Sequence, residues 1–473
     1  MKIKEQSMDN EWNKETNGSD TNGTKQSDTA VKEHYGFITA TTMIIGVVIG
    51  SGIFFKSDDI LTYTGGNVWL GVLVFCIGAW GIIFGSLTVT ELSTRTTKNG
   101  GIVGYFEAFI SDKIACGFGW FQTFVYFPTL IVVLAWVSGI YTCSLFGLAN
   151  TLEMQSLLGF LYLMFFYGIN LISAKIGGYF QNATTLIKLI PLLVIAIAGL
   201  FWGAPHPALE EGVKLVTTRN VGFAWLAALV PIAYSFDGWI IATNITNEVK
   251  NPKKNMTLAL ICGPIIVLGV YLTFFLGLTK MLGVTYIMST KDQAINKVGE
   301  LLLGTYGTKI ILIFIVISVL GVVNGLVLGG IRMPQALASK NMIPAANKVS
   351  IIHKRLQLSV PSLQISFFTS LIWFVIHYVT QKLNLLQGGD ISEIAIVFSY
   401  ACYIILYIKV IKMKKAGEVK GIFRGVICPI FAMAGAAIIF VGGFIRNPFY
   451  VSIFIAFCAF VFALGHRYFI KER

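Results

Sequence analysis

The sequence is poor in charged residues. Of its 473 residues, only 12% are Asp, Glu, Lys or Arg, whereas 55% are hydrophobic. A soluble protein normally carries about 25% charged residues, because water must solvate its surface. The composition therefore excludes a water-soluble protein and predicts an integral membrane protein.

Motifs for catalysis and cofactor binding are missing as well. The chain has no GxxxxGK[ST] phosphate loop, no HExxH motif and no GxSxG motif. Its five histidines show no metal-ligand spacing, and its seven cysteines form no CxxC pair. We therefore expect no enzyme activity, no catalytic residue, no metal site and no cofactor.

The first 34 residues lack an apolar run. They are rich in Asn, Thr, Lys, Glu and Asp, and Trp12 is their one aromatic residue. A cleaved signal peptide needs an apolar segment, so we expect none here. The composition predicts that residues 1–34 form a disordered cytoplasmic tail.

Long apolar runs fill the rest of the chain. A helix needs about 20 apolar residues to cross a bilayer, whereas a barrel strand needs about 10 alternating ones. The runs have the helical length, so we predict an all-α membrane protein with twelve transmembrane helices. The predicted spans are 37–61, 68–93, 115–147, 155–173, 179–202, 222–247, 256–279, 309–337, 358–381, 389–411, 422–441 and 447–468.

Positive charge is distributed unevenly between the loops. Lys98, Lys113, Lys340 and a cluster in 409–424 fall on the side that holds both termini. Cytoplasmic loops are enriched in Lys and Arg, so we expect cytoplasmic termini in a multi-pass protein of the plasma or inner membrane. The net charge of +13 then reflects topology and anionic lipid, not nucleic-acid binding.

The first span contains a sequence that disfavours a regular helix, Gly50-Ser51-Gly52. A single helix over 37–61 would be about 37 Å long, which leaves room for two half-helices. The second half would begin near Ser51 and direct free N–H groups toward an anion. Close packing between helices would also explain these small residues. The motif alone therefore does not distinguish a broken helix from a packing surface.

The sixth span contains a second interruption at Tyr234-Ser235-Phe236-Asp237-Gly238. A carboxylate such as Asp237 in mid-membrane is costly and usually faces a cavity or a partner, although a kink with Asp237 bonded to its neighbours is the alternative. The two interruptions fall in the first helices of two five-helix halves, which favours a transporter built from inverted repeats. Half-helix N–H groups and unwound carbonyls together complement an α-amino acid.

Several stretches resemble the amino acid–polyamine–organocation (APC) superfamily. They are GVVIGSGIF in span one, AYSFDGW in span six, the following NEVKNPKKN, ELSTRTTKNGG at 91–101 and SVLGVVNGLVLGGIRMPQALASKNMIP at 318–344. Ile102 replaces a glutamate that commonly follows the fourth stretch. The resemblance covers about 35–470 and is greatest to the L-type amino acid transporter branch, which includes bacterial serine/threonine and alanine/serine/cysteine exchangers.

The resemblance implies a fold and a domain organisation. The fold is a LeuT-like 5+5 inverted repeat with broken helices 1 and 6, plus two extra helices, which works by alternating access. The first repeat would cover 35–202 and the second 203–411. Residues 412–473 would supply the last two helices and a short cytoplasmic C-terminus.

The resemblance also implies a substrate site. The substrate carboxylate would meet the backbone N–H groups of Gly50, Ser51 and Gly52, and Tyr234 would act as a gating aromatic. Asp237 stands where relatives usually carry Gly or an apolar residue. The resemblance therefore implies a role for the backbone of Asp237 and not for its side chain. A proline that matches Pro128 places further side chains at the pocket floor. The ammonium would meet carbonyls near Val48 and Ile49 and those of Tyr234, Ser235 and Asp237. The substrate side chain would face Tyr126, Leu130, Leu134 and Phe236. Another wall of the pocket could come from Phe398-Ser399-Tyr400.

Lys188 lies about ten residues into an apolar span. An unpaired ammonium there costs at least about 2.5 kcal/mol, unless it snorkels to an interface. The resemblance implies that this lysine occupies the place of a sodium ion between the first and eighth helices. We therefore expect sodium-independent coupling, with the choice between exchange and proton symport open.

The function predicted from the whole sequence is exchange of small neutral L-amino acids. Proton-coupled symport, amino acid/amine antiport through Asp237, and a sensor that does not transport are the alternatives. Relatives in mammals join a heavy-chain glycoprotein through a cysteine between spans three and four. The loop GLANTLEMQ has no cysteine and Cys143 lies in the preceding helix, so we expect no such partner.

Overall fold

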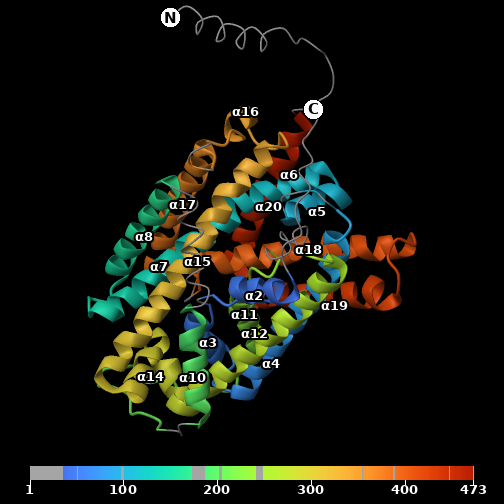
Figure 1. Cartoon of the computed structure of the whole chain (residues 1–473). Helices are drawn as coiled ribbons and strands as arrows, with labels where there is room; N and C mark the ends of the chain where they lie inside the picture. The colour runs from blue at the N-terminus through green and yellow to red at the C-terminus, as the bar shows by residue number, and fades with distance from the viewer. Residues whose placement is uncertain are drawn as a thin grey trace, which may run out of the picture. The chain divides into compact units, whose positions relative to one another are not determined.

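The structure is a computed structural model in which the described residues are almost entirely helical (Figure 1). It describes 36–50, 52–96, 98, 101–172, 187–201, 205–240, 249–353, 356, 358–386, 389–446 and 448–471. No β-strand occurs within these ranges, where His353 and Leu358 form one isolated bridge. The predicted tail 1–34 lies outside them.

The helices follow the predicted spans closely. Nine described helices are long and apolar enough to cross a membrane, and three shorter apolar segments fall in spans one, five and six. The predicted all-α membrane fold is therefore confirmed, whereas the repeat boundaries remain a prediction. The elements are α2 (Phe37–Val48), α3 (Gly52–Tyr63), α4 (Val68–Ser93), α5 (Gly101–Phe109), α6 (Asp112–Phe121), η1 (Gln122–Tyr126), α7 (Phe127–Phe146), α8 (Leu152–Ile172), α10 (Leu189–Phe201), η2 (Gly222–Ala228), α11 (Leu229–Ser235), α12 (Pro252–Leu282), α13 (Val284–Thr290), η4 (Lys291–Gln293), α14 (Ala294–Leu303), η5 (Gly304–Tyr306), α15 (Gly307–Ala338), α16 (Ala346–Val349), α17 (Val360–Lys382), α18 (Ile391–Lys415), η6 (Phe423–Ile427), α19 (Cys428–Arg446) and α20 (Pro448–Lys471).

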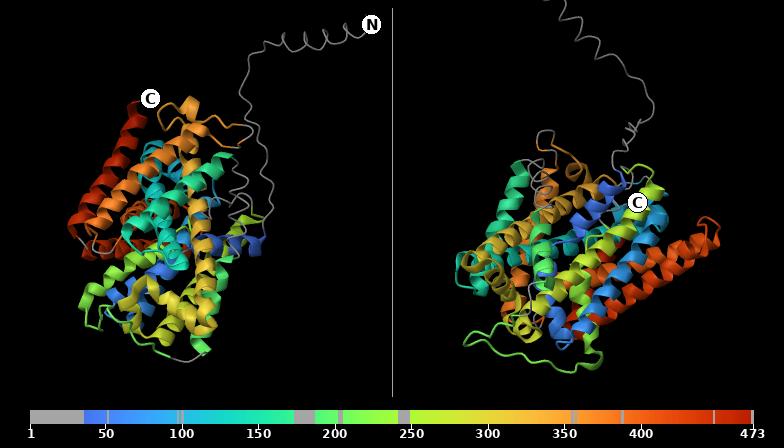
Figure 2. Two further views of the ribbon diagram at one scale, coloured as in Figure 1. Left: turned by 90° about the vertical axis from the view of Figure 1, so that its left-hand side faces the viewer. Right: turned by 60° about the horizontal axis from the view of Figure 1, so that its bottom comes forward.

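The broken helices lie among the long ones. The half-helix α3 packs against α11, while α2 packs against α12 and α12 against α4. On the other flank α15 packs against α7 and α17, as the two views of Figure 2 help to follow. Segments from the two predicted repeats therefore contact each other along their length.

Two helices approach each other closely where their glycines meet. A Cβ atom built on Gly199 of α10 would lie 2.4 Å from the backbone of Gly277 in α12. Small residues permit this approach, which supplies packing between helices when lipid offers no hydrophobic driving force. The outer faces are apolar instead, as exposed Leu161 and Phe165 on α8 and Ile372 on α17 show. These faces fit contact with lipid tails.

Glu107 ties the short helix α5 to the end of α15. Its carboxylate oxygens pair with Lys98, at 2.7 Å, and with Lys340, and its side chain is 14% exposed. Burial alone would raise the pKa of Glu107, but the hydrogen bonds and charges of Lys340 and Lys98 lower it from its ordinary value. The ionised carboxylate therefore contributes to stability.

We expect Glu107→Gln to lower the free energy of unfolding by about 1–3 kcal/mol, because two charge-assisted hydrogen bonds are lost. The lowered pKa implies that this contribution is full above the ordinary glutamate range and disappears as the pH falls through the folded value. Thermal unfolding in detergent at several pH values measures it. Glu300→Gln is the control, because that carboxylate is 55% exposed and its pair with Lys297 should matter little. Equal effects of both variants at neutral pH would contradict this interpretation.

Candidate functional site: a cavity between two broken helices

The first span is interrupted where the sequence predicts. The helix α2 ends at Val48, Ile49 leaves the helical conformation with ψ 96°, and α3 begins at Gly52. Ser51 lies outside the described residues. The first N–H groups of a helix and its last carbonyls have no partner within the helix. Donors of α3 and acceptors of α2 therefore meet at one place in the chain.

The sixth span is interrupted at the matching position. The helix α11 ends at Ser235, and a turn continues from Phe236 to Ile240. Gly238 has φ +92°, a backbone conformation that other residues rarely adopt. The Tyr234 carbonyl accepts a hydrogen bond from the Asp237 N–H, at 3.1 Å, within this turn. The glycine is thus required for the chain to leave the helix here.

Tyr271 of α12 connects the two interruptions. Its hydroxyl oxygen lies 2.8 Å from the Ser235 carbonyl oxygen and 3.2 Å from the Val48 carbonyl oxygen. One hydroxyl proton bonds to one acceptor at a time, so the two carbonyls share one donor. Each carbonyl oxygen can therefore accept a further hydrogen bond, for example from an ammonium. No sequence motif marked Tyr271, because an aromatic residue in an apolar span is ordinary.

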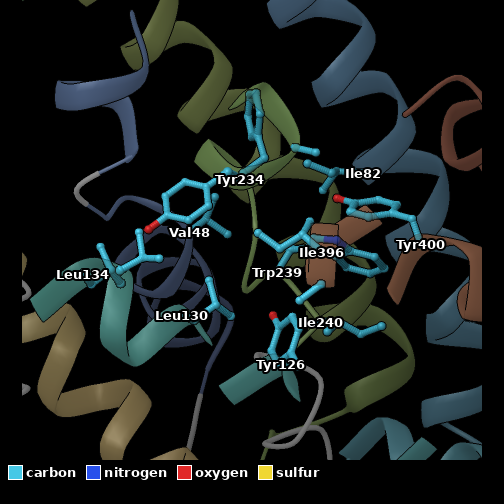
Figure 3. Close-up of a cluster of buried hydrophobic side chains, with 14 of the residues drawn as sticks. Val48, Ile82, Tyr126, Leu130, Leu134, Tyr234, Trp239, Ile240, Ile396 and Tyr400 are labelled. Atoms are coloured by element: carbon cyan, nitrogen blue, oxygen red, sulfur yellow. The ribbon is translucent and has the colours of Figure 1, made fainter. Parts of the chain in front are cut away.

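A cavity of about 690 Å³ lies between these breaks. Both broken helices contribute to its wall, as do the third, fifth, eighth and tenth spans. Most of the predicted substrate-binding residues line it: Val48, Gly50, Gly52, Tyr126, Leu130, Leu134, Tyr234, Ser235 and Asp237. Figure 3 shows how side chains from different helices, including Val48, Leu130 and Tyr234, come together there.

Five predicted wall residues lie away from the cavity. Ile49 and Phe236 are fully buried, and Phe236 packs against the Tyr271 ring with 5.1 Å between the ring centroids. Phe398 of α18 packs against Phe121 instead, and its neighbours Ser399 and Tyr400 do not line the cavity either. The tenth span instead contributes Tyr403, which lies one helical turn further on and which no sequence motif marks.

The third span is locally distorted beside the cavity. The π-helical segment η1 ends at Tyr126, immediately before Phe127 and Pro128 at the start of α7. Proline has no N–H group and its ring disturbs the preceding turn, which accounts for the irregular segment. The Tyr126 hydroxyl donates a hydrogen bond to Asp237 Oδ2, so a side chain of span three meets the turn of span six. Asp237 therefore has a partner and also faces the cavity.

Lys188 reaches the break in the first span. Its side chain is 2% exposed, and its ammonium donates a hydrogen bond to the Gly46 carbonyl near the end of α2. Lys188 also lines the cavity. Within the part of the chain that the structure describes, no hydrogen bond from Lys188 to α15 accompanies this contact. The structure thus brings the lysine to the first helix and leaves the predicted bridge to the eighth without a direct bond.

The cavity extends toward one end of the bundle. Its wall includes Gly101 and Ile102 of α5 and Arg332, Gln335 and Ser339 at the end of α15. At the opposite end Lys56 of α3 lies 5.2 Å from the centre of the Tyr234 ring and pairs with buried carboxylates. We call these the open end and the closed end.

A family model described as amino acid permease matches residues 35–464. The chain is 30% identical to the serine/threonine exchanger SteT of Bacillus subtilis over 407 residues, which cover 85% of this chain and 88% of that protein. It is 24% identical to the mouse Asc-type amino acid transporter 1 over 89% of this chain and 78% of that protein. For the mouse b(0,+)-type amino acid transporter 1 the identity is 23%, over 81% and 76%.

The residues that match the family model include both interruptions and every helix that lines the cavity. The matches agree with the resemblance to the L-type branch, and the relatives are transporters, not enzymes. The chain therefore belongs to the amino acid permease family of the APC superfamily.

Proposed function

We propose that this protein exchanges small neutral L-amino acids across the cell membrane by alternating access, independently of sodium. The observation that carries the proposal is that two interrupted helices meet at one cavity and share the Tyr271 hydroxyl. Free N–H groups at the start of α3 suit a carboxylate, and the carbonyls of Val48 and Ser235 suit an ammonium. The names of the relatives support an amino acid as the substrate.

The substrate would bind through the backbone at the breaks and through side chains around them. Gly50, Ser51 and Gly52 would hold the carboxylate, and Tyr234 would cover the ligand. The side chain of the substrate would face Tyr126, Leu130 and Leu134, whose bulk favours a small amino acid. We do not extend this role to Ile49 and Phe236, because the cavity does not reach them.

The proposed orientation follows from the loop charges. Lys98, Lys340 and Lys348 belong to the loops at the open end, so we place that end in the cytoplasm. The protein would then sit in the plasma or inner membrane with both termini inside. A heavy-chain partner is not proposed, because the loop before α8 has no cysteine and Cys143 is buried in α7.

Transport by proteoliposomes tests the proposal. Uptake of labelled serine or alanine is expected only when the vesicles contain amino acid, and choline in place of sodium should change nothing. Uptake into empty vesicles driven by a pH gradient would instead support the symport alternative. Specific binding without any transport would support a sensor.

The Asp237–Tyr126 pair separates a structural role from recognition of an amine. We expect Tyr126→Phe to reduce serine exchange by about tenfold, because it leaves a buried carboxylate short of one donor. Asp237→Asn should reduce it less, since the amide oxygen still accepts from the Tyr126 hydroxyl. Both variants are measured with serine and with a cationic amino acid. If Asp237→Asn removes cationic uptake and spares serine, the amine alternative is correct.

A further inference from the structure

Basic residues gather where α18 meets α19, at an end that projects from the bundle on the right of Figure 1. Residues 409–424 contain one acidic residue, Glu418, and six basic ones. We call the six the basic hairpin: Lys409, Lys412, Lys414, Lys415, Lys420 and Arg424. Within the part of the chain that the structure describes, Arg424 forms an ion pair and the five lysines form none. The basic hairpin therefore carries positive charge that its surroundings do not neutralise.

The backbone of the turn between α18 and α19 is ordered. Gly417, just after α18, has φ +83°. Its N–H donates to the Lys414 carbonyl, and the Glu418 N–H donates to the Met413 carbonyl, which is the Schellman pattern that ends many helices. Val419 is buried and anchors the turn. The ammonium groups are thus presented by a defined turn at the end of a long helix.

Two contacts hold the basic hairpin against its neighbours. A Cβ atom at Gly425 would lie 2.7 Å from Lys414 Cβ and Cγ, so the stem of this lysine packs on the backbone of η6. Arg424 Nη1 lies 3.3 Å from Glu91 Oε1 at the end of α4, and Glu91 also pairs with Arg95. The chain runs from α4 into α5, which lines the open end of the cavity. The basic hairpin therefore lies at the open end.

The helix dipole accounts for only part of this charge. Lys412, Lys414 and Lys415 lie in the last turn of α18, where cations interact favourably with the final carbonyls. Lys420 and Arg424 lie beyond that helix, in the turn and in η6. A structural role at the end of α18 does not explain them, whereas a bound anion explains the whole group.

Exposed apolar side chains beside the basic hairpin favour a lipid over a soluble anion. Ile422 is 67% exposed and Phe423 is 52% exposed, and Ile427 is exposed one turn further on. Such side chains suit the boundary between headgroups and acyl chains, from which the long stems of lysines reach the phosphates. The cytoplasmic leaflet is negatively charged and attracts basic segments next to a membrane helix.

We propose that the basic hairpin is a binding site for an anionic phospholipid. The phosphate lies among the ammonium groups, and the acyl chains lie along Ile422, Phe423 and Ile427. A headgroup that adds no positive charge, such as that of phosphatidylglycerol, complements the site, whereas the quaternary ammonium of phosphatidylcholine does not. The assignment to the cytoplasmic leaflet rests on the proposed orientation of the open end.

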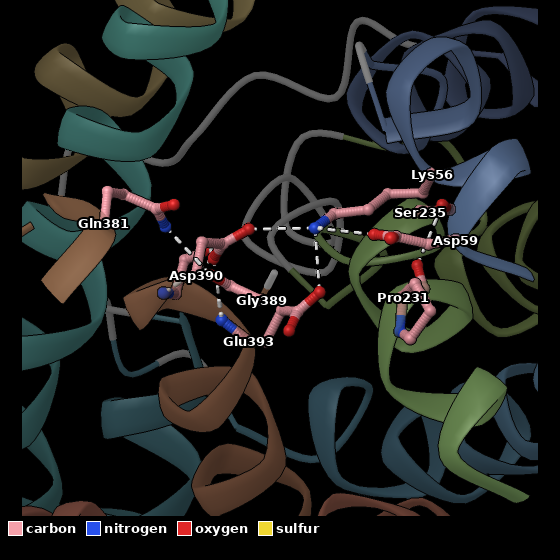
Figure 4. A network of polar contacts seen from close by, with 9 residues as sticks. Lys56, Asp59, Pro231, Ser235, Gln381, Gly389, Asp390 and Glu393 are labelled. Carbon is pink, nitrogen blue, oxygen red and sulfur yellow. Dashed lines mark hydrogen bonds and ion pairs between the residues drawn. The ribbon is translucent and has the colours of Figure 1, made fainter. Parts of the chain in front are cut away.

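A lipid at this site would contact a helix that also reaches the substrate cavity. The first turn of α18 lies at the closed end, where Asp390 and Glu393 pair with Lys56 of α3 (Figure 4). Tyr403, midway along α18, lines the cavity. The last turn carries the lysines of the basic hairpin. One helix therefore connects the lipid site, the cavity and the buried ion pairs of the closed end.

Photochemical labelling in a bilayer tests the location of the site. The purified protein is placed in phosphatidylcholine vesicles that contain a photoreactive phosphatidylglycerol, and mass spectrometry identifies the labelled peptides. We expect label within 408–427, which unlabelled phosphatidylglycerol displaces and added phosphatidylcholine does not. Inorganic phosphate at constant ionic strength should not displace it. Displacement by phosphate would show a site for a soluble anion and would overturn the assignment to lipid.

Removal of exposed lysines tests which side chains hold the lipid. The triple variant replaces Lys412, Lys415 and Lys420 by Gln, and all three side chains are exposed, so the fold should be retained. Each lysine near an anionic surface contributes about fivefold to binding. We therefore expect that half-saturation of labelling needs at least about tenfold more phosphatidylglycerol in this variant.

The matched control removes the same charge elsewhere on the same side. It replaces the exposed lysines Lys113, Lys254 and Lys348 by Gln and should leave labelling of 408–427 unchanged. Equal weakening in the two triple variants would mean that the whole positive surface attracts lipid, and the specific site would be wrong. Wild-type labelling in the first triple variant would also overturn it.

Gly425→Ala tests the arrangement without removing a charge. The added methyl group would displace the Lys414 stem, so we expect severalfold weaker labelling. Gly168→Ala is the control, because nothing lies within 4 Å of a Cβ atom there. Wild-type affinity in Gly425→Ala would contradict the proposed placement of the phosphate. If vesicles show no amino acid exchange while the labelling results hold, the proposed function fails and the lipid site stands.

Discussion

Replacement of Gly52 by alanine is expected to reduce amino acid exchange by about tenfold to a hundredfold, whereas alanine at Gly50 should leave most of it. A Cβ atom at Gly52 would lie 2.9 Å from Ser235 Cα and 3.1 Å from the Tyr234 ring. The contact is with backbone, so α3 and α11 would have to move apart, and overpacking of this kind costs about 1–3 kcal/mol. At Gly50 the nearest atom is a Val322 methyl carbon at 3.5 Å, an ordinary contact.

The two variants form a matched pair because the same methyl group is added on either side of one break. Initial rates of serine exchange in vesicles with equal amounts of protein provide the comparison. Thermal unfolding of both variants separates a misfolded protein from a folded protein with a distorted site. Full exchange by Gly52→Ala would show that close contact of the two interruptions is not needed.

Replacement of Lys188 by methionine is the second change with a large expected effect. Methionine keeps the apolar stem but removes the ammonium that bonds the Gly46 carbonyl. That carbonyl belongs to the last turn of α2, where no later N–H group of the helix donates to it. Loss of the ammonium should therefore lower the free energy of unfolding by about 1–3 kcal/mol. We expect exchange to fall by about tenfold or more.

Lys214→Met is the control for loss of a lysine, because Lys214 is exposed in the loop 205–221. Exchange by both variants is compared in sodium and in choline. Equal loss in the two salts fits a fixed ammonium that holds the break. If Lys188→Met exchanges like the wild type, the lysine does not have the proposed role.

The main features of the site could be predicted because they depend on local sequence. Gly50, Gly52 and Gly238 permit backbone conformations that interrupt a helix, and interruptions within a membrane need a polar surrounding. Their pairing in spans one and six is visible in the sequence as well. Most residues of the cavity wall, from Val48 to Asp237, could therefore be predicted from the sequence.

Side-chain directions at the ends of the broken helices were harder to predict. Phe236 comes two residues after Tyr234, which rotates it by about 200° around the helix, to the opposite face. Tyr234 consequently lines the cavity while Phe236 packs against Tyr271. A stretch of aromatics beside a break does not by itself tell which ring covers the substrate.

The buried ion pairs of Lys56 with Asp390 and Glu393 could not be predicted because the lysine is far from both carboxylates in sequence. Lys56 and Asp390 are separated by 334 positions, and each alone resembles a charged residue at a helix end. A signal was present in the stretch Lys56-Ser57-Asp58-Asp59, which places three charges in the first span. Its partners become visible only when α3 and α18 are brought together in space.

Equilibrium binding to the purified protein tests the central claim most directly, namely that the two breaks hold the carboxylate and the ammonium of an α-amino acid. Calorimetry would compare serine or alanine with its carboxamide and its N-acetyl derivative, which each remove one of these charges. We predict that the amino acid binds and that each derivative binds at least about tenfold more weakly, as expected for loss of one charge-assisted contact of about 1.5–3 kcal/mol. Equal binding of the carboxamide would contradict the claim.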